Sequence, residues 1–177
     1  MTPGLISNIR QNGYVVRDVD EAIAYWAGTC SVRPFHVLRR FVPQPMNLRG
    51  QPVQVELSIA VACVDGFQIE LIQQHNDAPS LYREHLQRAG PGLHHVGSLT
   101  EDYEGTLARF QAAGHAPVQT GLAFGCARYA YFDLGAEPGA AIEIIELCGA
   151  LAQFFQRVET ACRNATADTP DVVELSR

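Results

Sequence analysis

Two glutamates interrupt apolar strands at matching places in the two halves of the chain. Glu70 lies in segment 67–72 and Glu143 lies in segment 140–145, and aliphatic residues flank both carboxylates. Burying a lone carboxylate costs free energy unless a cation or hydrogen-bond donors compensate for it. Two glutamates at equivalent positions therefore mark a candidate site for a positively charged group.

A second pair of polar residues also matches, because the sequence contains an internal repeat. Residues 10–18 align without a gap with residues 94–102, and the match continues into the segment that follows each of them. In this register Gln11 corresponds to His95. Such a repeat predicts two copies of one structural unit, and it determines the architecture of the whole domain.

A pseudo-two-fold arrangement of the two copies would bring these four polar side chains to one point. The set consists of Gln11, Glu70, His95 and Glu143. Two carboxylates, one amide oxygen and one imidazole neutralise a divalent ion and leave room for water, which suits Zn, Ni, Co, Mn or Mg. The alternative interpretation has both carboxylates facing solvent and the amide merely exposed. Because the positions agree in register, the sequence favours a metal site.

His94 directly precedes the candidate ligand His95 in a predicted strand. Successive side chains of a strand point to opposite faces, so His95 is expected to point inward together with Leu93 and Gly97. His94 then lies on the other face, where we interpret it as structural or solvent-facing.

Hydrophobic periodicity and turn residues predict the same order of elements in both copies, a strand, a helix and three strands. In the first copy the strands cover 6–16, 34–41, 53–64 and 67–74, and the helix runs from its cap Asp18 to Gly28. In the second copy the strands cover 93–100, 116–120, 126–134 and 141–147, and the helix runs from Asp102 or a neighbour to Gly114. Residues 42–52 read as a loop, and the loop 133–139 is expected to be wide and mobile.

These elements describe one domain that covers residues 1–177. Its parts are a first βαβββ module (6–75), a linking helix (76–91), a second βαβββ module (92–147), and a C-terminal helix with its tail (148–177). Apolar residues at helical spacing place the C-terminal helix at 150–162, and the polar tail from Thr166 is expected to be frayed.

The composition argues against several classes of partner. The formal net charge is -6 and all 13 basic residues are arginine, which disfavours binding to nucleic acid. No apolar stretch approaches the length of a membrane span, and no signal peptide is evident. The 5 cysteines are an odd number without a CxxC pair, so we expect free thiols and a cytoplasmic location.

The repeat, the Gly-Leu-His-His sequence at 92–95 and the Ile-Glu-hydrophobic strand endings resemble the vicinal oxygen chelate superfamily, which includes glyoxalase I, methylmalonyl-CoA epimerase, extradiol dioxygenases and antibiotic-resistance proteins. The resemblance covers residues 6–147. It implies an α+β fold in which two βαβββ modules form a cupped mixed sheet, with one metal donor on the first and last strand of each module. Those donors would be Gln11, Glu70, His95 and Glu143. The family also suggests a homodimer acting on a small-molecule substrate.

The donor set helps to choose among the reactions of this superfamily. Its iron-dependent dioxygenases use two histidines and one carboxylate, so a set with a single histidine disfavours oxygen chemistry. The set is similar to that of zinc-type glyoxalase I, but Val15 and Pro91 stand where that family has arginines for glutathione. The surroundings look more like methylmalonyl-CoA epimerase, because Asn76-Asp77 and then Gly-Leu-His-His follow the second ligand.

The resemblance to the epimerases implies a catalytic glutamate, and Glu56 in the sequence Val-Glu-Leu occupies the corresponding place. The predicted reaction is metal-dependent isomerisation or epimerisation through an enolate of a small carbonyl or acyl-CoA substrate. Glu56 or Glu143 would take the proton, and a carboxylate on the other face would return it. The alternatives are a glyoxalase I-like lyase acting on a thiol adduct, and a protein that binds a small molecule without turnover.

Overall fold

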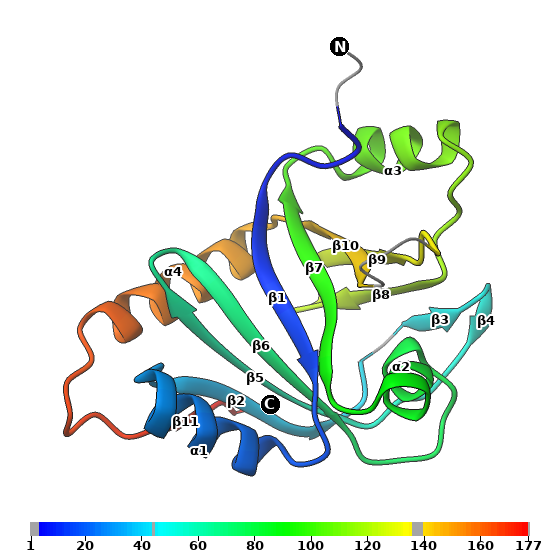
Figure 1. The fold of residues 1–177 in the computed structure, drawn as a ribbon. Helices are drawn as coiled ribbons and strands as arrows, with labels where there is room; N and C mark the ends of the chain where they lie inside the picture. Colours follow the sequence, from blue (N-terminus) through cyan, green and yellow to red (C-terminus); the bar gives the residue numbers. More distant parts are fainter. Residues whose placement is uncertain (1–3, 44, 136–139, 177) are drawn as a thin grey trace.

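The fold is organised around an antiparallel pair of strands, one from each copy of the repeat. The computed structural model describes residues 4–43, 45–135 and 140–176, and in these ranges β1 (Ile9–Val15) pairs with β7 (Gly92–Thr100) inside an 11-stranded sheet. The strand order is β11-β2-β5-β6-β1-β7-β10-β9-β8-β3-β4. The β1–β7 pair therefore joins the two modules edge to edge in one curved sheet (Figure 1).

The first module has the predicted order of elements. After β1 come α1 (Val19–Cys30), β2 (Phe35–Phe41), β5 (Leu57–Val64) and β6 (Phe67–Gln74). The predicted cap is confirmed, because the Asp18 side chain accepts hydrogen bonds from the backbone N–H groups of Asp20 and Glu21. Strand β6 returns parallel to β1, and β5 pairs with both β6 and β2.

The second module repeats this arrangement. It consists of β7, α3 (Tyr103–Ala112), β8 (Gln119–Ala123), β9 (Ala127–Phe132) and β10 (Ala141–Glu146). Helix α2 (Leu81–Ala89) links the modules, and α4 (Gly149–Arg163) follows the second one. The fold is thus the predicted α+β arrangement of two βαβββ modules with a C-terminal helix. Strand β8 begins at Gln119, later than the predicted start at 116.

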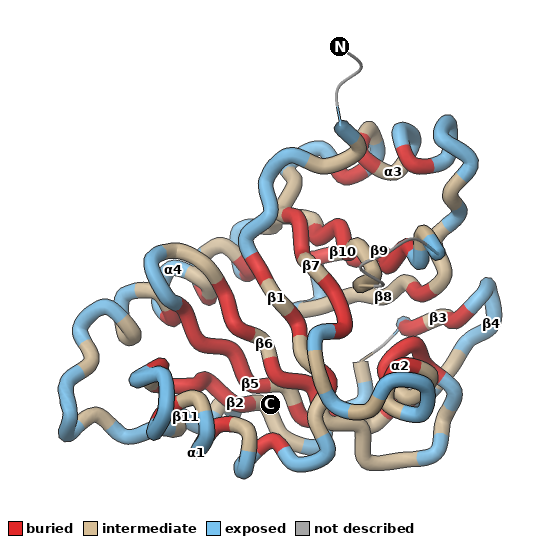
Figure 2. The backbone as a smooth tube through the Cα atoms, viewed as in Figure 1, coloured by how far each residue is buried: buried red, intermediate tan, exposed pale blue. Residues whose placement is uncertain are grey.

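Helices α1 and α4 cover opposite faces of the first half of the sheet. On β5, Ala60 packs with Ile23 of α1, while Val61 belongs to the cluster that contains Phe154 of α4. The alternation of side chains along the strand produces this division. Figure 2 shows buried backbone running along the central strands and exposed backbone at the ends of the helices.

Two segments predicted without regular structure add strands to the sheet. Residues 42–52, predicted as a loop, contain β3 (Met46–Leu48) and β4 (Gln51–Pro52), and β3 pairs with β8 of the second module. The tail, predicted to be frayed, contains β11 (Val172–Glu174), which pairs in parallel with β2. An ion pair of 2.8 Å between Arg39 and Glu174 joins these two strands. Both pairings depend on residues far apart in the sequence.

The prediction that all cysteines are free is wrong for one pair. Cys126, just before β9, and Cys148, just before α4, form a disulfide with their Cα atoms 6.2 Å apart. The other three cysteines, Cys30, Cys63 and Cys162, are free. The fold brings together two residues whose spacing carries no recognisable motif. The cytoplasmic location stays a prediction.

The remaining expectations concern the loop after β9 and membrane association. Asp133 to Gly135 are described, but residues 136–139 of the loop predicted to be mobile lie outside the described residues. Among the described helices, none combines the length and the apolar character that crossing a membrane requires.

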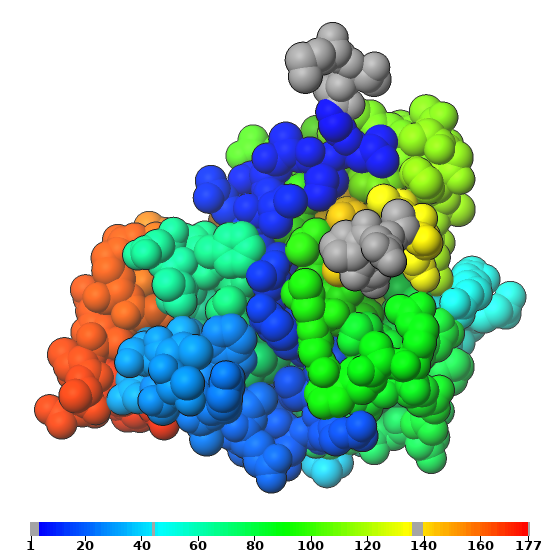
Figure 3. Space-filling view, in the orientation of Figure 1, coloured from blue at the N-terminus to red at the C-terminus, as the bar shows by residue number. Residues whose placement is uncertain are grey.

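In the space-filling view, the blue residues of the first module and the green residues of the second adjoin along the middle of the molecule (Figure 3).

Candidate active site

Glu70 and His95 are brought together across a glycine of the central strand pair. In the sheet register Gly13 of β1 lies beside Glu70 of β6 on one side and beside His95 of β7 on the other. A Cβ atom at Gly13 would collide with the imidazole ring of His95. The ring therefore lies across the space that the missing side chain leaves open.

Gln11 and Glu143 have the same relation to the second glycine of the pair. Gly97 of β7 lies beside Gln11 of β1 and beside Glu143 of β10. A Cβ atom at Gly97 would lie 2.7 Å from Oε1 of Gln11. Since Gly13 and Gly97 correspond in the internal repeat, the two halves build the site in the same way.

The four predicted donors meet around Nε2 of His95. This nitrogen lies 3.2 Å from Oε2 of Glu143, 3.4 Å from Oε2 of Glu70, and 3.4 Å from Oε1 of Gln11. His95 is 0% exposed, Gln11 2% and Glu143 5%, while the Glu70 side chain is 14% exposed. The structure thus excludes the alternative in which these side chains face solvent. Their role as metal ligands stays a prediction.

The chemistry of this donor set fits a divalent ion. Donors around one zinc-sized ion lie about 3.0–3.4 Å apart when each metal–donor distance is about 2.1 Å, which resembles the separations around His95. Oε2 of Glu143 is buried without a hydrogen-bond partner, although it lies 3.2 Å from His95. Within the described ranges, no group of three or more His, Cys, Asp or Glu side chains is arranged so that it could hold a metal ion as the side chains stand. Binding of an ion would therefore require a shift of the glutamate side chains, with the Gln11 oxygen as a further donor.

Without an ion, the two carboxylates hold a proton on the imidazole. Burial by itself lowers the pKa of His95, but the nearby carboxylates of Glu143 and Glu70 outweigh burial and raise that pKa to about 9. Burial raises the pKa of Glu70, and the contact with His95 offsets only part of this effect. A divalent cation would compensate the same buried negative charges that the imidazolium compensates.

Comparison with known proteins places this arrangement in a family. The family model for the glyoxalase/bleomycin resistance protein/dioxygenase superfamily matches residues 10–132. The chain belongs to this superfamily. A search of curated proteins found no match.

Several solved structures share the superfamily fold with this chain. Methylmalonyl-CoA epimerase from Mycobacterium tuberculosis is 17% identical, with a TM-score of 0.62, and the alignment covers 86% of this chain and 96% of the epimerase. A hypothetical protein from Bacillus halodurans is 16% identical, with a TM-score of 0.60 and coverages of 80% and 94%. Streptomyces coelicolor methylmalonyl-CoA epimerase, in complex with 2-nitronate-propionyl-CoA, is 17% identical, with a TM-score of 0.55 and coverages of 81% and 99%. At these identities the likeness concerns the fold.

The side chain of His94 does not lie on the face that regular alternation along β7 would predict. A bulge shifts the register of β7 against β1, because Gly13 pairs with His95 whereas Tyr14 pairs with Leu93. His94 is the extra residue. It is 3% exposed, so the solvent-facing alternative is wrong, and Leu93, predicted to point inward, is 40% exposed.

The structure does not place Glu56 with the four donors. Glu56 directly precedes β5, and its carboxylate forms an ion pair of 3.3 Å with Arg40. On β5 the residue opposite Glu70 is Val61, and five residues of strand correspond to about 16 Å. Its predicted catalytic role stays a prediction, without support from this geometry.

Sequence reasoning missed Gln68, which orients one of the donors. Nε2 of Gln11 donates a hydrogen bond of 3.1 Å to Oε1 of Gln68, so that Oε1 of Gln11 is the atom that faces His95. Gln68 is 5% exposed on β6, two residues before Glu70 and hence on the same face. The criterion that identified the glutamates, a polar residue in an apolar strand, applies to Gln68 as well.

Proposed function

We propose that this chain is a metal-dependent isomerase or epimerase that forms an enolate of a small carbonyl or acyl-CoA substrate. The observation that carries the proposal is the convergence of Gln11, Glu70 and Glu143 on Nε2 of His95, at a buried point between the two modules. The ion would be Zn, Ni, Co, Mn or Mg, because oxygen donors outnumber the single nitrogen.

The two carboxylates have the properties that proton transfer requires. A divalent ion held by these donors would polarise the substrate carbonyl and stabilise the enolate. Glu143 is the proton acceptor we propose, because its Oε2 is buried and has no hydrogen-bond partner. Glu70 comes from the other module and lies 3.4 Å from the same nitrogen of His95, so it is the carboxylate that we propose returns the proton.

The acyl-CoA part of the proposal draws support from similar folds. Two of the similar structures are methylmalonyl-CoA epimerases, and the Streptomyces coelicolor protein was solved with 2-nitronate-propionyl-CoA. A 2-substituted acyl-CoA is therefore the first substrate class to test. A homodimer is likewise a proposal, to be tested by measuring the mass of the protein in solution.

The decisive experiment combines metal binding with proton exchange. The purified protein is loaded with Zn, Ni, Co, Mn or Mg and incubated with 2-substituted acyl-CoA thioesters in deuterated water. We expect deuterium at the α carbon for the wild type and for Glu146→Gln, a control on the same strand. Exchange should fall by at least about 100-fold in Glu143→Gln, as expected for loss of a proton-transfer group.

Other outcomes of this experiment identify the alternatives. Bound metal without exchange on any thioester would contradict the enolate mechanism for this substrate class. Turnover of a thiol adduct of a ketoaldehyde would favour the glyoxalase I-like lyase. Ligand binding that is unaffected by metal removal and by Glu143→Gln would favour binding without turnover.

A further inference from the structure

The two adjacent histidines of β7 are in direct contact through the same ring position. Nδ1 of His94 lies 3.0 Å from Nδ1 of His95, and the two rings are nearly perpendicular, with their centroids 5.2 Å apart. Side chains of neighbouring strand residues normally point to opposite faces. The bulge at His94 makes this contact possible, because it removes His94 from the alternating pattern.

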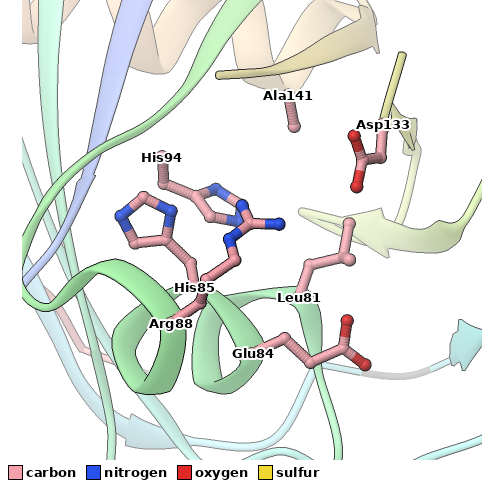
Figure 4. Close-up of a pocket in the computed structure, with 7 residues that line it drawn as sticks. All are labelled: Leu81, Glu84, His85, Arg88, His94, Asp133 and Ala141. Carbon is pink, nitrogen blue, oxygen red and sulfur yellow. The ribbon is translucent and has the colours of Figure 1, made fainter. Parts of the chain in front are cut away.

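Packing holds the His94 ring in place on its other sides. Its centroid lies 5.2 Å from the ring of Tyr82, 5.3 Å from that of His85 and 5.6 Å from that of Tyr131. Figure 4 shows His94 and His85 side by side at the edge of a small cavity of about 30 Å³, which is roughly the space of one water molecule. The ring therefore has little freedom to turn away from His95.

The hydrogen-bond partners of His94 determine which of its nitrogens carries a proton. Nδ1 of His94 and Nδ1 of His95 lie 3.0 Å apart, so in the hydrogen bond between them one nitrogen carries the proton and the other accepts it. A His95 ring that offers the lone pair of Nε2 to a cation carries its proton on Nδ1, which leaves Nδ1 of His94 as the acceptor. A neutral imidazole with its proton on Nε2 has an acceptor lone pair on Nδ1.

We propose that His94 is a positioning residue whose Nδ1 accepts the Nδ1–H of His95 and so fixes the tautomer of that ring. When a cation takes the place of the proton on Nε2, the other proton of His95 stays on Nδ1, and the lone pair of Nε2 faces the point where Gln11, Glu70 and Glu143 meet. The partner of a ligating histidine commonly sets both the tautomer and the ring orientation in this way. The functional part of this inference rests on the proposed metal site, but the hydrogen bond itself does not.

The hydrogen bond can be tested on the wild-type protein without any metal. In protein labelled with ¹⁵N-histidine, a nitrogen–nitrogen coupling across the hydrogen bond should connect Nδ1 of His95 with Nδ1 of His94, and the shared proton should appear on His95. Absence of this coupling in well-resolved spectra, or a proton assigned to Nδ1 of His94, would overturn the proposal. This result does not depend on whether the protein binds zinc.

Substitutions then test the consequence for metal binding, with zinc alone as the probe. His94→Leu removes the acceptor and should weaken zinc binding by about 10- to 100-fold, the usual effect of losing such a partner. His94→Asn, whose Oδ1 can replace Nδ1 as the acceptor, should recover most of that loss. His85→Phe, which alters a ring packed on His94, serves as the control and should bind zinc like the wild type.

The outcomes separate this inference from the proposed function. Equal zinc affinity in the wild type and His94→Leu would overturn the positioning role, as would equal loss in the Leu and Asn variants. If the wild type binds none of Zn, Ni, Co, Mn and Mg, the proposed function fails, and the coupling measurement alone decides whether His94 fixes the His95 tautomer. If His94→Leu does not fold, the Asn variant and the wild-type spectra still decide the question.

Discussion

At the scale of single residues, the site depends on two glycines as much as on its four donors. Gly13 leaves space for the ring of His95, and Gly97 leaves space for the amide of Gln11. Neither glycine has a backbone conformation that requires glycine, since neither has a positive φ. Close approach of a side chain is therefore the reason that each position needs glycine.

Replacing Gly13 should displace the imidazole. We expect Gly13→Ala to lower the free energy of unfolding by about 1–3 kcal/mol, the usual cost of overpacking, and to abolish zinc binding because the His95 ring must move. Urea unfolding and zinc titration measure both effects. Gly28→Ala in α1 is the matched control, since a Cβ there would have no atom within 4 Å apart from its chain neighbours and the backbone of its own helix. Normal zinc binding by Gly13→Ala would contradict the assigned position of the ring.

The protonation of His95 should make the stability of the metal-free protein depend on pH. The pKa of His95 is raised from 6.5 to about 9, so its contribution is fully present below pH 6.5 and disappears as pH rises through about 9. The loss should be on the order of 3 kcal/mol, from 1.4 kcal/mol for each pKa unit. Urea unfolding between pH 6 and pH 10, compared with His95→Gln, measures it. An equal pH dependence in the variant would contradict this assignment.

At the scale of elements, α4 covers the face of the sheet on which the donors lie. Val61, opposite Glu70 in the register, and Ile145, two residues from Glu143, belong to the same apolar cluster as Phe154 of α4. The disulfide at Cys148 attaches the start of this helix to the beginning of β9. The C-terminal helix is therefore part of the core that surrounds the site.

Removing the main anchor of α4 should destabilise the whole domain. Phe154 is 4% exposed, and we expect Phe154→Ala to lower the free energy of unfolding by about 3–5 kcal/mol, through lost burial and the cavity left behind. Gln156→Ala, at an exposed position of the same helix, should change it by less than about 0.5 kcal/mol. Urea unfolding compares the two variants. A small effect of Phe154→Ala would show that α4 packs loosely on the sheet.

At the scale of the whole molecule, the two modules share one sheet instead of forming separate units. The central strands β1 and β7 pair with each other and with β6 and β10, while β11 and β4 lie at the two edges. Strand β3 provides a second connection, since it follows the first module's β2 in the chain but pairs with β8. Unfolding of either module would therefore expose the site and would also remove the strands that pair with the other module.

Hydrogen exchange should reflect this arrangement. We expect the backbone amides of β1 and β7 to exchange only through global unfolding, and those of β11 and β4 to exchange orders of magnitude faster through local opening. Exchange followed by mass spectrometry measures the difference in the metal-free protein. Edge strands that are as protected as the central pair would indicate that another surface covers them, which a homodimer could provide.

The internal repeat made the principal features of this protein readable from the sequence. The equivalence of Gln11 with His95 and of Glu70 with Glu143 identified four side chains that converge in the structure, because a repeat places equivalent residues symmetrically and apolar flanks imply burial. The order of strands and helices followed from local periodicity, turn residues and caps such as Asp18, all of which act over a few residues.

Only the tertiary structure decided the features that depend on strand register and on distant partners. The bulge that buries His94 exists in the pairing of β7 with β1, and no property of β7 alone reveals it. The separation of Glu56 from the donors, the Cys126–Cys148 disulfide, and the added strands β3 and β11 have the same origin. Local sequence determines which residues can form a strand, whereas long-range packing determines which strand they pair with and which side chains meet.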